Sequence, residues 1–170
     1  MKSLLMFAGL AMITLASFGQ RKDNPKSPFK EVKGTSASGT PIYISYNAPS
    51  VRGRTIGKDL EPMPGKVWRT GADSATAFEV SKAVKINGKD LPAGRYALFT
   101  IANGDDWTIL FNSDVHKWGA FSYKESADVL KVDVKAKKAA SFAEQLAITA
   151  SNKGEVHILW GDSDVSFTVK

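Results

Sequence analysis

Three arginines and a tryptophan gather in residues 46–76, a stretch without a strand-length alternating run until its last residue. Arg52 and Arg54 are two residues apart, so in an extended backbone both side chains point to the same side. A guanidinium group is a planar fork of donors that suits carboxylate, phosphate or sulfate. Trp68 and Arg69 are adjacent, and an aromatic plane beside a guanidinium can grip a sugar ring. The stretch therefore predicts a surface for an anionic or sugar-like ligand.

A second loop with polar and aromatic residues follows the apolar run WTILFN. Asn112, His116 and Trp118 flank this loop, residues 112–119. We expect it to lie beside the 46–76 stretch, with a shallow pocket of basic, aromatic and amide groups between them. The candidate ligand-binding residues are Tyr46, Arg52, Arg54, Trp68, Arg69, Thr76, Asn112, His116 and Trp118.

The arginines also have a structural interpretation. An arginine in a long loop often donates hydrogen bonds to loop carbonyls and stacks on a tryptophan. The carboxylates of Asp59, Glu61, Asp73 and Glu79 are close enough in sequence to pair with the arginines. The sequence leaves loop bracing and ligand binding both open.

Familiar catalytic motifs are absent from the sequence. There is no G-x-S-x-G elbow, P-loop or dinucleotide fingerprint. Of the two histidines, His157 alternates with apolar residues, which indicates a solvent-facing strand position. We therefore predict no catalytic residue, no metal ligand and no cofactor, and we favour a non-enzymatic binding or structural module. The alternative is a periplasmic hydrolase in which His116 is the general base, acting with polar loop residues.

Residues 1–19 have the pattern of an export signal. Lys2 provides the positive start, an apolar run extends from Leu4 to Phe18, and Ser17 and Gly19 predict cleavage after Gly19. The run is shorter than the ~20 residues that a spanning helix needs, so no membrane span is expected after cleavage. The sequence thus predicts a periplasmic or secreted protein.

The composition narrows the expected partners. The 170 residues include no cysteine, so packing and hydrogen bonds alone must hold the domain. The formal net charge is +6, and the lysines are spread along the chain rather than clustered. General solubility explains most of this charge, and nucleic acid is not an expected partner of an exported protein. An anionic or glycan ligand, or an envelope protein, is the expected partner, and the sequence does not predict the oligomeric state.

Short alternating apolar runs separated by turn residues predict an all-β fold. The Asn87-Gly88 pair, for example, is a strong hairpin signal. We expect a single-domain antiparallel β-sandwich, jelly-roll-like, with a long irregular loop between the first strands. Residues 20–40 are polar and predict a flexible N-terminal arm, which leaves residues 41–170 as the β-sandwich domain. Residues 136–145 are compatible with a short helical turn.

Several motifs together carry a family resemblance. They are YNAPSVRGRTIG (46–57), GKVWRTGADSAT (65–76), LPAGRYALFTI (91–101), WTILFN (107–112) and Lys117-Trp118-Gly119. In this order they closely resemble a family of exported bacterial proteins catalogued as domain of unknown function 2911, typical of Bacteroidetes-type envelopes. The resemblance extends from about Ser27 to Val169. It implies a secreted or periplasmic single-domain β protein, and it supplies no catalytic residues because the family has none agreed.

Overall fold

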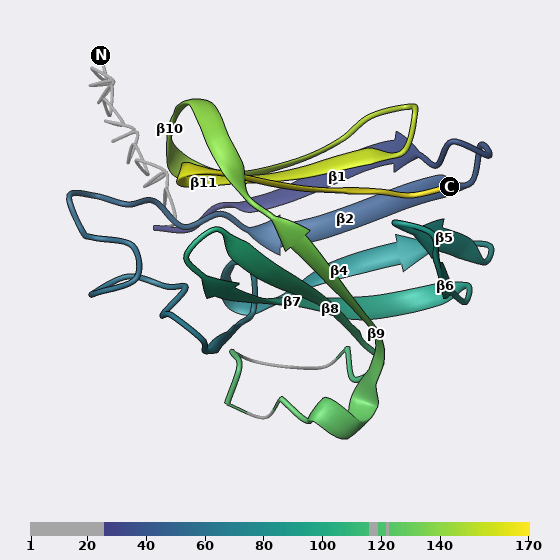
Figure 1. Cartoon of the computed structure of the whole chain (residues 1–170), viewed down its shortest axis with the longest axis horizontal. Helices are drawn as coiled ribbons and strands as arrows, with labels where there is room; N and C mark the ends of the chain where they lie inside the picture. The colour runs from purple at the N-terminus through teal and green to yellow at the C-terminus, as the bar shows by residue number, and fades with distance from the viewer. Residues whose placement is uncertain (1–25, 116–118, 122) are drawn as a thin grey trace, which may run out of the picture.

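Antiparallel strands are the main elements of the described part of the chain, which confirms the predicted all-β sandwich (Figure 1). The computed structural model describes residues 26–115, 119–121 and 123–170. The predicted export signal lies outside the described residues, as do His116 and Trp118. Within the described part of the chain, no helix has the length and apolar character needed to cross a membrane.

The first layer is a seven-stranded antiparallel sheet. Its strand order is β1-β2-β4-β7-β8-β9, and the short β3 pairs with β7. The strands are β1 (Phe29–Thr35), β2 (Pro41–Asn47), β3 (Val67–Trp68), β4 (Ala72–Val80), β7 (Gly94–Asn103), β8 (Asp106–Asn112) and β9 (Asp128–Lys135).

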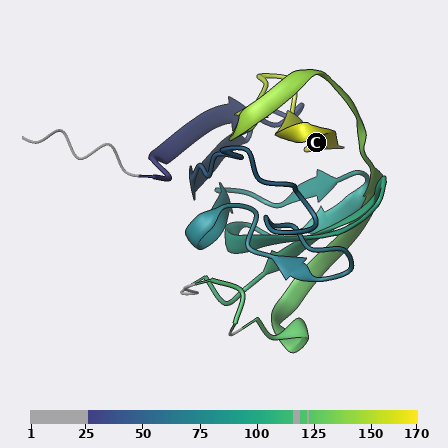
Figure 2. The same cartoon turned by 90° about the vertical axis from the view of Figure 1, so that its left-hand side faces the viewer.

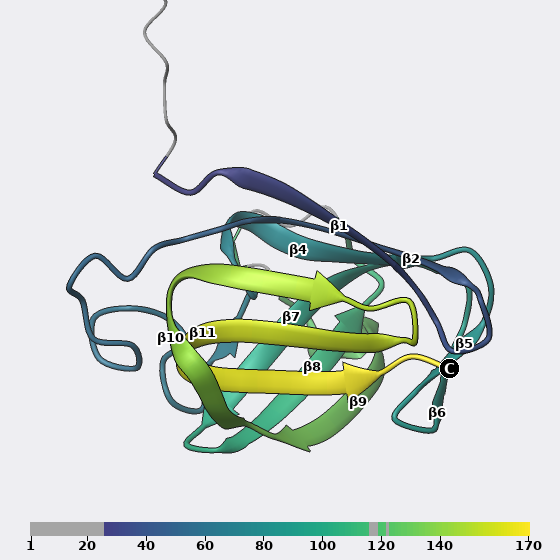
Figure 3. The same cartoon turned by 90° about the horizontal axis from the view of Figure 1, so that it is seen from above.

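The second layer lies over this sheet, as the view from above shows (Figure 3). It contains β10 (Lys137–Ala150) and β11 (Glu155–Thr168), with the hairpin of β5 (Val84–Ile86) and β6 (Lys89–Leu91) at one end. β11 doubles back on itself in the same view, and the amide of Val169 accordingly donates to the carbonyl of Gly154 over 2.7 Å. A Cβ atom on Gly154 would lie 2.0 Å from the carbonyl oxygen of Val169, which follows β11, so only glycine permits this close approach.

Aromatic rings join the two layers. Phe78 of β4 contacts Phe111 of β8 edge-to-face at 5.1 Å between ring centroids, and Phe111 contacts Phe167 of β11 at 5.8 Å. All three side chains are buried. Each lies at an alternating apolar position of its strand, so the period-2 pattern of the sequence identifies the inner faces of both layers.

Part of the predicted flexible arm is a strand instead. β1 lies inside residues 20–40 and pairs with β2 along its full length, from Phe29 opposite Asn47 to Thr35 opposite Pro41. The β-sandwich therefore begins before residue 41. β1 is an edge strand with only one fully buried residue, so backbone pairing rather than an apolar pattern holds it, and the sequence carries little trace of that pairing.

The helical turn considered for residues 136–145 is wrong, because this segment belongs to β10. Lys137 pairs with Asp164 of β11, and the amide of Ala136 donates to the carbonyl of Asp105 over 2.8 Å. Alanine, lysine and glutamate favour helices locally, but long-range strand pairing overrides that weak preference.

Candidate functional site

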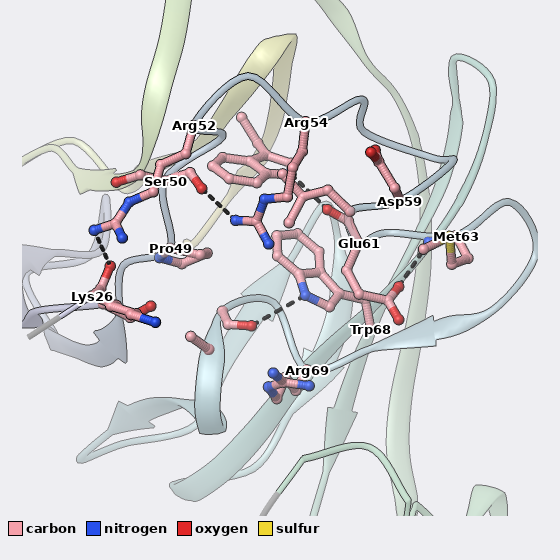
Figure 4. Close-up of a pocket in the computed structure, with 15 residues that line it drawn as sticks. Lys26, Pro49, Ser50, Arg52, Arg54, Asp59, Glu61, Met63, Trp68 and Arg69 are labelled. Atoms are coloured by element: carbon pink, nitrogen blue, oxygen red, sulfur yellow. Dashed lines mark hydrogen bonds between the residues drawn. The ribbon is translucent and has the colours of Figure 1, made fainter.

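A cavity of about 510 Å³ opens beside the loop that joins β2 to β3 (Figure 4). This loop lies at one end of the sandwich, the end that faces the viewer in Figure 2. The volume falls within the roughly 300–1,000 Å³ of small-molecule sites. The charged residues that line the cavity are Lys26, Arg52, Arg54, Asp59, Glu61 and Arg69. The structure thus brings the three predicted arginines to one cavity.

Arg52 and Arg54 brace the loop as well as lining the cavity. Arg54 donates from Nε to the Val51 carbonyl (3.1 Å) and from Nη2 to the Ser50 carbonyl (2.7 Å). Arg52 donates from Nη2 to the Lys26 carbonyl over 3.2 Å, which ties the start of the described chain to the loop. These bonds use only some of the N–H groups of each guanidinium, so the two arginines still have donors to offer.

Arg69 has no such role. Its side chain forms no hydrogen bond or ion pair with a described residue, and its Nε atom is buried without a partner. A strained turn follows it, in which Thr70 has φ 55°, a conformation that β-branched residues rarely adopt. The hydroxyls of Thr70 and Thr100 are 3.1 Å apart, and Thr76 donates to the Thr70 carbonyl over 2.7 Å. Buried hydrogen bonds therefore hold the turn that presents Arg69.

Two stacked tryptophans line the cavity. The rings of Trp68 and Trp160 have centroids 6.1 Å apart and planes 26° apart. Trp68 Nε1 donates to the Gly71 carbonyl over 3.2 Å, and Trp160 Nε1 donates to the Glu61 carbonyl over 2.8 Å. The two residues are only 2% and 1% exposed. Trp68 therefore fixes the loop, and its ring face is covered where a stacking platform for a sugar would need it open.

Tyr46 and Thr76 are placed in the core rather than at the cavity. Tyr46 is 3% exposed, and its hydroxyl accepts a hydrogen bond from the Ile148 amide over 2.9 Å, which links β2 to β10. Thr76 is fully buried. Neither side chain lines the cavity.

Asn112 is committed to a hydrogen-bond network elsewhere. Its Nδ2 donates to the Lys124 carbonyl (3.0 Å) and to Asp128 Oδ1 (2.7 Å), while its Oδ1 accepts from the Asp114 amide (3.0 Å). The short helix η1 (Glu125–Ala127) beside this network lies below the large sheet, on the side away from β10 and β11 (Figures 1 and 2). Asn112 does not line the cavity, so the expected pocket between the two loops is not formed by this residue.

Sequence reasoning missed four charged or aromatic residues that line the cavity: Lys26, Asp59, Glu61 and Trp160. The acidic pair was considered only as a brace for the arginines, but among the described side chains neither carboxylate forms an ion pair. Asp59 Oδ1 instead accepts from the Thr55 amide (2.6 Å) and Glu61 Oε2 from the Met63 amide (2.7 Å). Asp59 and Glu61 could have been predicted as lining residues, because they belong to the same 46–76 stretch as the arginines. Lys26 and Trp160 could not, because they reach the cavity only through tertiary contacts.

The model of a protein family described as "Protein of unknown function (DUF2911)" matches residues 27–169. This match spans every strand of both layers and all cavity residues except Lys26. The chain belongs to this family. The resemblance of the sequence motifs is thereby confirmed. No curated protein and no solved structure matches the DUF2911 chain.

The acidic and histidine side chains of the DUF2911 domain are scattered over its described part. No group of three or more His, Cys, Asp or Glu side chains able to hold a metal ion occurs in the part of the chain that the structure describes. On β11, His157 Nδ1 lies 2.8 Å from Asp164 Oδ1, and the two side chains are 37% and 24% exposed. Neither residue lines the cavity. This pair is on the solvent side of its strand, where the sequence placed His157.

The stability of the DUF2911 domain is expected to fall in alkali. Burial raises the pKa of Tyr46, and burial together with the Asp128 hydrogen bond raises the pKa of Tyr123, both from the ordinary 10.0. A raised folded pKa means that stability is fully present below pH 10 and is lost as the pH rises through the folded values. Urea unfolding across neutral and alkaline pH measures this loss.

The matched variant for this test is Tyr123→Phe. It removes one of the four phenols whose pKa is raised, so stability should fall less steeply with pH than in the parent protein, although it is lower at neutral pH. Identical slopes for variant and parent would contradict the assignment to Tyr123.

Proposed function

We propose that this protein is a non-enzymatic binding module whose cavity takes a small anionic ligand. The observation that carries the proposal is Arg69, a guanidinium that lines the cavity with its Nε buried and unpartnered. An unsatisfied buried polar group costs about 1–3 kcal/mol, and a strained backbone position such as Thr70 costs a similar amount. A ligand carboxylate or phosphate supplies the missing acceptor through charge-assisted hydrogen bonds.

The charge of the cavity supports the same proposal. Four cations line it against two carboxylates. Leu60, Met63 and the tryptophans add apolar surface, so the ligand combines an acidic group with a small apolar part. The sugar-like alternative has less support because the Trp68 ring is covered.

We argue for binding rather than hydrolysis because no histidine is among the described residues that line the cavity. The general base of the hydrolase alternative, His116, lies outside the described residues. We also propose that the protein acts after export, in the periplasm or outside the cell, on the basis of the signal pattern in residues 1–19.

The substitution Arg69→Met is expected to abolish binding without destabilising the fold. It removes the unpaired buried donor while keeping a long apolar side chain, so the free energy of unfolding should be unchanged or slightly higher. The measurement is thermal unfolding with inorganic phosphate, sulfate, acetate and succinate. A ligand at a hundredfold excess over Kd stabilises the folded state by about 2.7 kcal/mol.

The control is Arg95→Met, which removes an exposed arginine of β7 that does not line the cavity. This variant should keep the full response to the anion. Equal responses from both variants, or no response of the parent protein to any anion, would argue against the proposed function.

A further inference from the structure

The cavity holds charges of both signs that do not neutralise one another. Asp59 and Glu61 share it with Lys26 and the three arginines, yet among these described side chains no cation pairs with either carboxylate. Each carboxylate accepts one backbone hydrogen bond, Asp59 through Oδ1 and Glu61 through Oε2. The other oxygen of each has no hydrogen bond to a described residue. The cavity therefore has unused acceptors as well as unused donors.

The acidic residues lie together on one side of the cavity. Figure 4 shows Asp59 and Glu61 on this side, Lys26 and Arg52 on the opposite side, Arg54 between them, and Arg69 below Trp68. A ligand that extends from Arg69 toward the acidic side thus meets a guanidinium group at one end and carboxylates at the other.

The acidic side is held by the loop itself. The turn that contains Asp59 is closed by the Gly57 amide, which donates to the Leu60 carbonyl over 2.8 Å. The Glu61 carbonyl accepts from the buried Trp160 ring, which fixes the backbone of this residue. Because the carboxylates start from fixed backbone positions, less ordering is needed when a cation binds.

We propose that the ligand is a zwitterion, a free amino acid or short peptide, with its carboxylate at Arg69 and its ammonium group at Asp59 and Glu61. This inference rests on the proposed function, because it assigns the acidic group of the ligand to the same arginine. A simple anion would leave two carboxylates unpaired in the cavity and be repelled by them, whereas a zwitterion pairs with both sides. An extended peptide separates its charges by roughly 3.5 Å per residue, so its length can match the span.

The test is calorimetric titration of the mature chain with alanine, dialanine and trialanine, each compared with its N-acetyl and C-amide forms. At least one zwitterion should bind, and each cap should weaken binding about tenfold or more, because it removes a charge-assisted hydrogen bond. Asp59→Asn and Glu61→Gln should weaken the zwitterion and leave the N-acetyl form unchanged or tighter. The matched control is Glu79→Gln, an exposed glutamate of β4 that does not line the cavity.

The outcomes separate this inference from the proposed function. If N-acetyl peptides, succinate or phosphate bind as tightly as the zwitterions, and Glu61→Gln has no selective effect, the ammonium assignment is overturned while anion binding stands. If neither zwitterions nor anions bind the parent protein, both proposals fail. Zwitterion binding that Arg69→Met leaves intact would overturn the place given to the carboxylate.

Discussion

Replacing Trp160 by alanine is expected to lower the free energy of unfolding by about 3–5 kcal/mol, the usual effect of truncating a fully buried tryptophan. Trp160 is 1% exposed and stacks on Trp68, which belongs to the other layer. It also donates the 2.8 Å hydrogen bond that holds the Glu61 carbonyl. The substitution removes apolar contact between the layers and the anchor of the cavity loop together, so ligand binding should be lost as well.

Urea and thermal unfolding measure this effect, and at about 2–4 °C per kcal/mol the expected fall in Tm is roughly 10 °C. Trp160→Phe keeps an aromatic ring but not the donor, so its loss should be intermediate. Phe142→Ala is the matched control, because this β10 aromatic is 52% exposed and its truncation should change stability by less than about 0.5 kcal/mol. Equal losses for Trp160→Ala and Phe142→Ala would refute the role of Trp160 as the link between layers and loop.

The second large effect is expected for Asp128→Ala. The Asp128 side chain is only 2% exposed, and it accepts hydrogen bonds from Asn112 (2.7 Å) and the Tyr123 hydroxyl (2.5 Å). Lys131 Nζ lies 3.5 Å from its Oδ2. Removing the carboxylate leaves the Tyr123 hydroxyl without its acceptor and takes one of two acceptors from Asn112 Nδ2, while Lys131 keeps its ion pair with Glu125. A hydrogen bond to a charged group contributes about 1.5–3 kcal/mol, so the loss of both should lower the free energy of unfolding by about 3 kcal/mol or more.

The fall is measured by urea unfolding, with Asp133→Ala, an exposed aspartate of the same strand, as the control. Asp128→Asn keeps one acceptor oxygen and should lose less. Because neither Asn112 nor Asp128 lines the cavity, the folded fraction of Asp128→Ala should bind anions with the Kd of the parent protein. A binding defect in this folded fraction would show that the second loop belongs to the site after all.

Trp160 and Asn112 illustrate which features of a residue could be predicted from the sequence. The inward position of Trp160 follows from its alternation with Val156 and Ile158, and the structure buries all three. Asn112 is a candidate in the sequence because it flanks the loop that follows the WTILFN run. Its actual partners, Lys124 and Asp128, lie beyond the loop that follows it, and no local pattern relates the amide to them.

The sequence predicted which segment forms the candidate site, but not the hydrogen-bond partners of its carboxylates. The 46–76 stretch and its three arginines are visible as a break in the strand pattern, and all three line the cavity. The expected ion pairs with Asp59 and Glu61 are not formed among the described residues, because both carboxylates cap backbone amides within the loop. Proximity in sequence does not determine the direction in which a loop side chain points.

The β class, the inner faces of the strands, the family motifs and the segment that carries the arginines could all be predicted from the sequence. All of these depend on residue types and on a period of two, which are local properties of the chain. The folded structure was needed to show that β1 joins the sheet, that Lys26 and Trp160 complete the cavity, and that the Arg69 side chain is left without a partner. The physical reason is that hydrogen-bond partners and burial are set by contacts between segments far apart in sequence, which form when the layers pack.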